Sequence, residues 1–186
     1  ACNYDSEVIV ANNVLCEYAE DHFDCDENCL SQYLMNPWTI QVSASVQPWN
    51  VPTLDPAYDN ENYFGANSSA DDDYDSQDIP EPPSAGCTNC LSAYFIHDEW
   101  DYPLGNNFTQ DYKSTHDFCE SKSWILTVDA NCTGEGELEF DYINIPEGLI
   151  VEMVSGADTT TITDNQITGI SLEANTPQHF IINVTW

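Results

Sequence analysis

The sequence has very little positive charge. Its 186 residues include no arginine and two lysines, Lys113 and Lys122, against 33 aspartate and glutamate residues, so the formal net charge is −31. Such a surface repels nucleic-acid phosphates and anionic membranes and attracts divalent cations. Solubility in a salty medium explains the same excess. No nucleic-acid partner is therefore expected.

Long apolar runs are also missing. No stretch approaches the roughly 20 apolar residues that a membrane-spanning helix needs, so the sequence predicts no membrane span. It has neither an initiator methionine nor a signal peptide. A chain that starts at Ala1 is expected to be a processed mature protein or the visible part of a longer one.

The familiar catalytic motifs are absent too. The four histidines do not form an HExxH frame, and neither a GxSxG elbow nor a phosphate-binding loop occurs. His97-Asp98-Glu99 is the most enzyme-like cluster, but pairs of acids arise by chance in so acidic a chain. The protein is therefore not expected to be an enzyme.

Cysteine, in contrast, is plentiful and even in number. Disulfides are favoured over zinc, because the CxxC pair at Cys87 and Cys90 has neither a second CxxC nor a histidine pair to complete a tetrahedral set. Disulfides imply an oxidising, extracellular location. About 105 connectivities are open to eight cysteines. The cysteines are Cys2, Cys16, Cys25, Cys29, Cys87, Cys90, Cys119 and Cys132.

Period-two alternation of apolar and polar residues dominates residues 123–186. In residues 138–142 the apolar side chains fall on one face and the acids on the other, as in a half-buried strand. Further strands are expected at 124–128, 149–154, 170–174 and 180–186. Turn signals at 133–136, 146–148, 164–165 and 175–177 separate these runs. The sequence predicts an all-β fold, an Ig-like antiparallel β-sandwich.

The predicted domain organisation has two parts. Residues 1–36 form a small disulfide-rich N-terminal extension that lacks enough apolar side chains for its own core. Residues 37–186 form the β-sandwich domain, with strands expected at 40–46 and 91–96, a long acidic loop at 48–90 and a polar connection at 97–122.

The extension carries a distinctive motif. Residues 1–5 read ACNYD, residues 16–20 read CEYAE, and residues 23–30 read FDCDENCL. This resembles the cysteine-rich "ACNYD…CEYAE…YDCDGNCL" repeat of secreted surface proteins from bacteria that use type IX secretion. The usual acidic DDGSC turn of that repeat is replaced here by NNVLC at 12–16.

A second resemblance covers roughly residues 38–186. The segment YFGANSSADDDYDSQDIPEPP at 63–83, followed by AYFIHDEW at 93–100, is similar to a β-sandwich module of the same secreted proteins. The resemblance implies a sandwich fold and a cell-surface location, and it implies no enzymatic activity.

One apolar segment stands out in the extension. Val8, Ile9 and Val10 form a short run that either packs on its own domain or is donated as a strand to the sheet edge of a neighbouring copy. Strand donation satisfies the unpaired backbone groups of an edge, and head-to-tail repetition makes an open filament.

Calcium is the predicted cofactor. Asp71, Asp72, Asp73, Asp75 and Asp78 offer hard oxygen ligands suited to Ca²⁺. Asp24, Asp26 and Asn28 form a second candidate set. The alternative for the longer cluster is a solvated acidic loop.

Glycosylation is predicted at several positions. Asn67, Asn107, Asn131 and Asn183 stand in Asn-x-Ser/Thr frames. Thr159 follows an aspartate and resembles the frame on which bacteria with type IX secretion place O-glycans. Unmodified polar loops are the alternative.

Together these features predict an extracellular structural subunit that assembles with copies of itself into a surface fibre or sheath. The alternative is an adhesin or a carbohydrate-binding sandwich module. The aromatic side chains available for sugar binding are Trp49, Tyr58, Tyr63, Trp100 and Tyr102.

Overall fold

The computed structural model describes residues 36–49, 55–83, 90–100, 102–103, 105–115 and 121–185, and this part of the chain is all-β. No helix among these residues could cross a membrane. The strands are β1 (Trp38–Pro48), β2 (Ala57–Asn67), β3 (Ile79–Pro80), β4 (Leu91–Ile96), β5 (Asn107–Ser114), β6 (Lys122–Ala130), β7 (Gly134–Ile143), β8 (Ile150–Ser155), β9 (Asp158–Ile162), β10 (Gln166–Leu172) and β11 (Gln178–Thr185).

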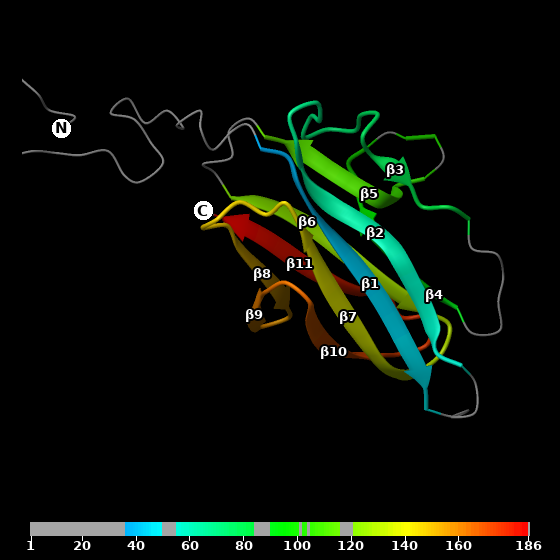
Figure 1. Cartoon of the computed structure of the whole chain (residues 1–186). Helices are drawn as coiled ribbons and strands as arrows, with labels where there is room; N and C mark the ends of the chain where they lie inside the picture. The colour runs from blue at the N-terminus through cyan, green and yellow to red at the C-terminus, as the bar shows by residue number, and fades with distance from the viewer. Residues whose placement is uncertain are drawn as a thin grey trace, which may run out of the picture.

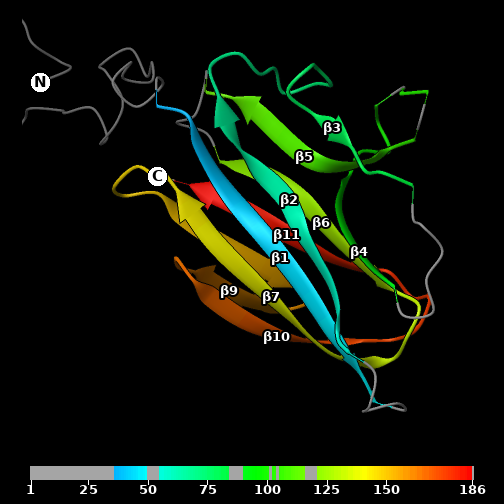
Figure 2. The same cartoon turned by 45° about the vertical axis from the view of Figure 1, so that its right-hand side comes forward.

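The strands belong to one sheet with the order β10-β7-β1-β2-β5-β4-β6-β11-β8-β9, and β3 adds to β5. The sheet folds over on itself, so that β10, β7, β1 and β2 face β4, β6, β11 and β8 (Figures 1 and 2). The predicted all-β, sandwich-like architecture is confirmed. It is not purely antiparallel, because β2 and β5 pair in parallel. This pair is where the sheet passes from one layer to the other.

The core lies between the two layers. Every second residue of β1 from Trp38 to Val46 is buried, as a strand with one dry face requires. The indole of Trp38 meets that of Trp124 across the layers, with ring centroids 5.8 Å apart and planes at 72°. Phe64 contacts both indoles, so these rings join β1, β2 and β6.

Four strands lie where the sequence predicts none, and the shortest of them, β3, is in the predicted loop 48–90. β2 occupies part of the predicted loop 48–90, and only its second half is largely buried. β5 lies in the predicted connection 97–122, and its inward positions include the polar residues Asp111 and Ser114. β9 is exposed except at Ile162. In each of these strands, exposed or polar side chains interrupt the alternation of apolar and polar residues by which a strand is predicted from sequence.

The turn predictions are mostly confirmed. Asn165 and Asn175 adopt positive φ angles of 56°, which asparagine tolerates better than most residues, in the turns predicted at 164–165 and 175–177. The turn predicted at 133–136 is wrong, since Gly134 already pairs with Pro48 as the first residue of β7.

Candidate functional site

The aspartate-rich loop between β2 and β3 uses its carboxylates to bind its own backbone. Asp75 accepts hydrogen bonds from the N–H groups of Asp71 and Gln77, both at 2.5 Å. Asp78 accepts from Asp75 N at 2.9 Å and from Tyr112 N at 3.0 Å. These bonds attach the loop to β5.

Asp72 anchors the same loop to β6. Lys122 Nζ lies 2.7 Å from both carboxylate oxygens of Asp72, and Ser114 N donates to Asp72 Oδ1 at 2.8 Å. In the described part of the chain, no three His, Cys, Asp or Glu side chains lie close enough together to hold a metal ion. Calcium binding by Asp71, Asp72, Asp73, Asp75 and Asp78 stays a prediction, and Asp24, Asp26 and Asn28 lie outside the described residues.

A buried polar cluster lies beneath this loop. His97 Nε2 and Asp111 Oδ2 are 2.7 Å apart, and His97 Nδ1 lies 2.7 Å from Glu99 Oε1. Asp111 is fully buried, and its Oδ1 has no hydrogen-bond partner in the structure. Trp100 stacks on the imidazole with centroids 3.4 Å apart. The His97 imidazole is therefore covered, and its contact with Asp111 attaches the loop after β4 to β5.

Burial and pairing shift the pKa values of these groups. Burial alone would lower the pKa of His97, but its hydrogen bonds to Asp111 and Glu99 and their negative charge raise it. Burial raises the pKa of Asp78 to about 6, although backbone hydrogen bonds from Asp75 and Tyr112 oppose the shift. Burial likewise raises the pKa of Glu81 to about 7, against a hydrogen bond from Ser92.

Two of the eight predicted disulfide cysteines lie in the described region. Cys90 is disulfide-bonded. Cys132 has a free thiol, which differs from the expected pairing, and its partial burial raises its pKa. The residue before it, Asn131, connects the end of β6 to the start of β4. Its backbone N–H donates to the carbonyl oxygen of Cys90, and its Oδ1 accepts from the N–H of Cys90. The other predicted positions, Cys2, Cys16, Cys25, Cys29, Cys87 and Cys119, lie outside the described residues.

The predicted glycosylation positions differ in accessibility. Asn131 and Thr159 are exposed, while Asn67, Asn107 and Asn183 are half-buried. Asn183 lies on the face of β11 opposite the buried residues Phe180, Ile182 and Val184, as its sequence pattern predicts. Ser123 Oγ donates to its Oδ1 at 2.6 Å.

Strand β10 forms one open edge of the sheet, and β9 forms the other. The sequence QITGISL of β10 contains no charged residue and no proline, although natural edges usually carry such residues to prevent pairing with other chains. Ile167, near its start, is 57% exposed. The predicted donor residues Val8, Ile9 and Val10 lie outside the described residues.

The backbone polarity of β10 follows from its neighbour β7. Phe140 O accepts from Asn165 N, and Tyr142 N donates to Asp164, so the even-numbered residues of β7 direct their backbone groups toward β10. In an antiparallel ladder these groups alternate in direction. With Thr168 opposite Leu138, the N–H and C=O groups of Ile167 and Gly169 face the open side.

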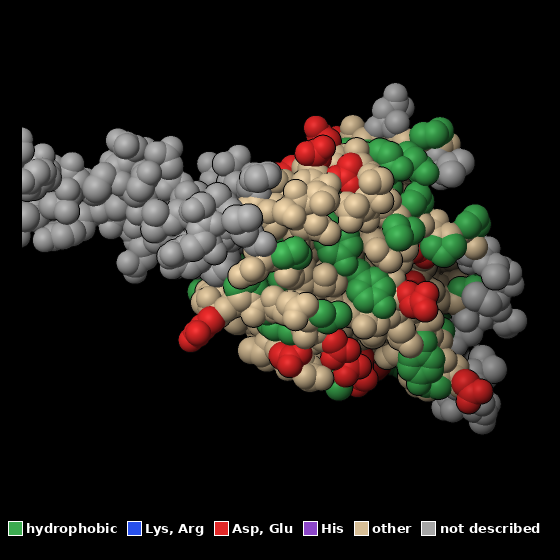
Figure 3. All heavy atoms as spheres, turned by 45° about the horizontal axis from the view of Figure 1, so that its top comes forward, with side chains coloured by type: hydrophobic (Ala, Val, Ile, Leu, Met, Phe, Trp, Pro, Cys, Tyr) green, Lys and Arg blue, Asp and Glu red, His purple; other side chains and the backbone are tan. Residues whose placement is uncertain are grey.

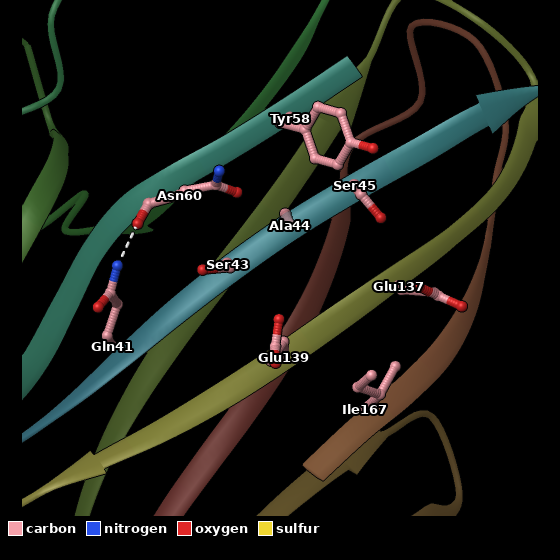
Figure 4. A pocket seen from close by; sticks show the side chains of 9 residues that line it. All are labelled: Gln41, Ser43, Ala44, Ser45, Tyr58, Asn60, Glu137, Glu139 and Ile167. Atoms are coloured by element: carbon pink, nitrogen blue, oxygen red, sulfur yellow. Dashed lines mark hydrogen bonds between the residues drawn. The ribbon is translucent and has the colours of Figure 1, made fainter. Parts of the chain in front are cut away.

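A groove runs along the outer face of β1, between β2 and β7 (Figure 4). Ser43, Ala44 and Ser45 form its floor, and its volume is ≈ 380 Å³. Tyr58, 62% exposed, lies on one side, and Glu137 lies on the other. Of the aromatic residues predicted for sugar binding, Tyr58 lines this groove, whereas Trp100 and Tyr102 pack on Phe108 at the end of the sandwich.

Comparison with known proteins gives no relative. No protein-family model, no curated protein and no solved structure matches the chain. The functional interpretation therefore depends on the edge, the groove and the charge of the molecule itself.

The sequence places Glu99 in one cluster with His97, but it reveals neither the second partner of His97, Asp111, nor the groove. Asp111 lies 14 residues from His97, inside the segment 97–122 that the sequence predicts to be a connection, so no local motif links the two. The groove depends on pairing among β1, β2 and β7, and the sequence does not predict β2 as a strand. The one sequence feature that points to the groove is the alternation of small polar residues with apolar ones along β1.

Proposed function

We propose that the protein is an extracellular structural subunit that assembles with copies of itself into a surface fibre or sheath. The observation that carries the proposal is the unprotected edge at β10. It offers outward backbone groups at Ile167 and Gly169, an exposed isoleucine, and no charge or proline to oppose pairing. A strand added there would gain main-chain hydrogen bonds and lie beside Ile167.

The proposed donor is the apolar run Val8, Ile9 and Val10 of another copy. At about 3.3 Å per extended residue, the roughly 27 residues between Val10 and Trp38 span at most on the order of 90 Å. Disulfides within this stretch, which holds Cys16, Cys25 and Cys29, would shorten that reach, but the donor needs to reach only an adjoining copy. Donation from one copy to the next is a heterologous contact, and its repetition makes an open filament. In this proposal, Ca²⁺ screens the repulsion from the net charge of −31. Disulfides cross-link the N-terminal extension.

A matched pair of substitutions at one position tests the edge. A Cβ at Gly169 meets no atom within 4 Å, so Gly169→Ala keeps the outward N–H and leaves assembly intact. Gly169→Pro removes that N–H and places a ring at the edge, where proline can be tolerated. We expect Gly169→Pro to abolish fibres seen by negative-stain microscopy while circular dichroism retains the β-sheet signal.

Deletion of residues 1–15 and treatment with EDTA test the donor and the cation. We expect the deletion to leave monomers in light scattering, and EDTA to shorten or dissolve the fibres. Monomers of the full chain in every buffer, with Ca²⁺ present or absent, would contradict the proposal. So would fibres that Gly169→Pro leaves unchanged.

A further inference from the structure

The groove on β1 has the length and direction of a site for a chain molecule. A second hollow of ≈ 380 Å³ shares Ser45, Tyr58 and Glu137 with the first and continues along β1 to Gln47 and Glu135. The two hollows together form a trough parallel to the strand. The trough is open to solvent and floored by small side chains, so an extended polymer can lie along it.

An irregularity in the β1–β2 ladder shapes one wall. Val42 pairs with Asn62 and Ala44 with Asp59, so Asn60 and Glu61 both lie opposite Ser43. Such a bulge increases the local twist and redirects side chains. Gln41 Nε2 donates to the Asn60 carbonyl oxygen at 2.5 Å, the bond drawn in Figure 4. The bulge is thereby fixed, and Tyr58 stands at the rim.

The side chains of the trough suit sugars. Tyr58 presents an exposed ring that can stack on the C–H face of a pyranose. The carboxylates of Glu137 and Glu139 accept hydrogen bonds from neighbouring hydroxyl groups, and Ser43 and Ser45 can donate or accept. Polar groups placed around one aromatic platform are typical of sites that orient a polyhydroxylated ligand.

Charge decides among ligand classes. The lining contains carboxylates and no lysine, arginine or histidine among the described residues. Lys122 is paired with Asp72, and Lys113 lies over the Trp124 ring, so neither lysine lines the trough. On the side of the molecule drawn in Figure 3, Asp and Glu are the only charged side chains visible among the described residues. Polyanions such as uronate or sulfated chains are therefore repelled.

We propose that the β1 trough binds an uncharged polysaccharide, with Tyr58 as the stacking platform and Glu137 and Glu139 as hydroxyl acceptors. This activity goes beyond self-assembly. It would let a fibre of this protein attach to a neutral glycan coat through many weak sites. Repeated along a fibre, such sites raise the overall binding strength without any new contact.

The test is affinity electrophoresis of the full chain through gels that contain neutral glucans, mannans or xylans, followed by calorimetry on the strongest ligand. Alginate serves as the anionic arm and chitosan as the cationic arm. We expect retardation by at least one neutral polysaccharide, weak dependence on salt, and no retardation by alginate.

Substitutions locate the site. Tyr58→Ala is expected to weaken binding by at least about tenfold, equivalent to about 1.4 kcal/mol, whereas Tyr58→Phe retains most of it. Glu137→Gln with Glu139→Gln should weaken binding by a similar factor. Trp49→Ala removes an exposed aromatic outside the trough and serves as the control, with no change expected. Thermal unfolding confirms that each variant is folded.

Three results would overturn the inference. The first is that no neutral polysaccharide retards the protein. The second is binding that Tyr58→Ala leaves unchanged. The third is binding to chitosan alone that disappears at high salt, because it would show an ion-exchange surface and not a sugar site.

Discussion

At the scale of single residues, Gly65 is where β1 and β2 come too close for a side chain. A Cβ added there would lie 2.1 Å from the carbonyl oxygen of Trp38, a backbone atom. Because Trp38 and its neighbours form the centre of the core, the backbone cannot retreat without disturbing the packing of Phe64 and Trp124.

We therefore expect Gly65→Ala to lower the free energy of unfolding by about 2 kcal/mol or more, the usual cost of overpacking. Gly169→Ala is the matched control, since open space surrounds that position, and it should change stability by less than about 0.5 kcal/mol. Urea unfolding followed by tryptophan fluorescence measures both. Equal stabilities of the two variants would contradict the close approach of the strands.

His97 supports a second prediction at this scale. Its side chain is 7% exposed, and it bridges buried Asp111 and the 66% exposed Glu99. His97→Ala leaves Asp111 buried without its cation, and breaking a buried pair typically costs about 3–5 kcal/mol. Glu99→Ala removes only the exposed partner and should cost less than about 1 kcal/mol. Chemical denaturation at pH 6 distinguishes the two variants, and comparable losses would show that Asp111 is not the main partner.

At the scale of elements, the aspartate-rich loop is held by a lysine from another strand. Lys122, at the start of β6, is buried and contacts both oxygens of Asp72. Asp72 also accepts from Ser114 N at the end of β5. The loop is therefore attached at two strands that are distant from it in sequence.

Asp72→Ala should release this loop while the sheet stays folded. We expect cleavage by a protease specific for aspartyl or aromatic bonds within 71–78 to become several-fold faster. Asp73→Ala is the control, because Asp73 is exposed on the same loop and its loss should leave the cleavage rate near that of the unmodified protein. Identical digestion patterns for both variants would mean that the Lys122 pair does not restrain the loop.

The strands differ in how well the sequence predicts them. Strands such as β1, β4 and β6 were predictable, because their apolar residues alternate and the dry face is continuous. The strand β5 is not predictable, since its buried positions include Asp111, whose carboxylate is paired with His97 from the loop after β4. The edge at β10 could be predicted as a strand but not as an edge, because strand order depends on pairing across the whole chain.

At the scale of the whole molecule, three groups, Asp78, Glu81 and His97, make the fold more stable at mildly acidic pH. His97, Asp78 and Glu81 all have raised pKa values in the folded protein. A group that binds its proton more tightly when folded stabilises the fold as it becomes protonated. Protonation of further acids also reduces the repulsion from a net charge of −31.

The free energy of unfolding should accordingly rise as the pH falls from about 8 to about 5. The contribution of His97 is fully present below its unfolded pKa of about 6.5 and is lost as the pH rises through its raised folded value. At still lower pH the trend reverses, because Glu99 has a lowered pKa and its pairing is lost on protonation. Melting temperatures between pH 4 and pH 8 measure the curve. A maximum of the melting temperature above pH 7 would contradict the raised pKa values of these groups. His97→Ala should make the melting temperature depend less on pH on the alkaline side of the maximum.

The first and last described strands, β1 and β11, each lie between two antiparallel neighbours in opposite layers. The start of β1 and the end of β11 lie at the same end of the sandwich (Figures 1 and 2). A pull on the chain through these two points therefore acts across the strands and opens their ladders from that end, one hydrogen bond after another. Many hydrogen bonds would break together only if the pull ran along the strands. A subunit built this way offers little resistance to tension applied between these two ends.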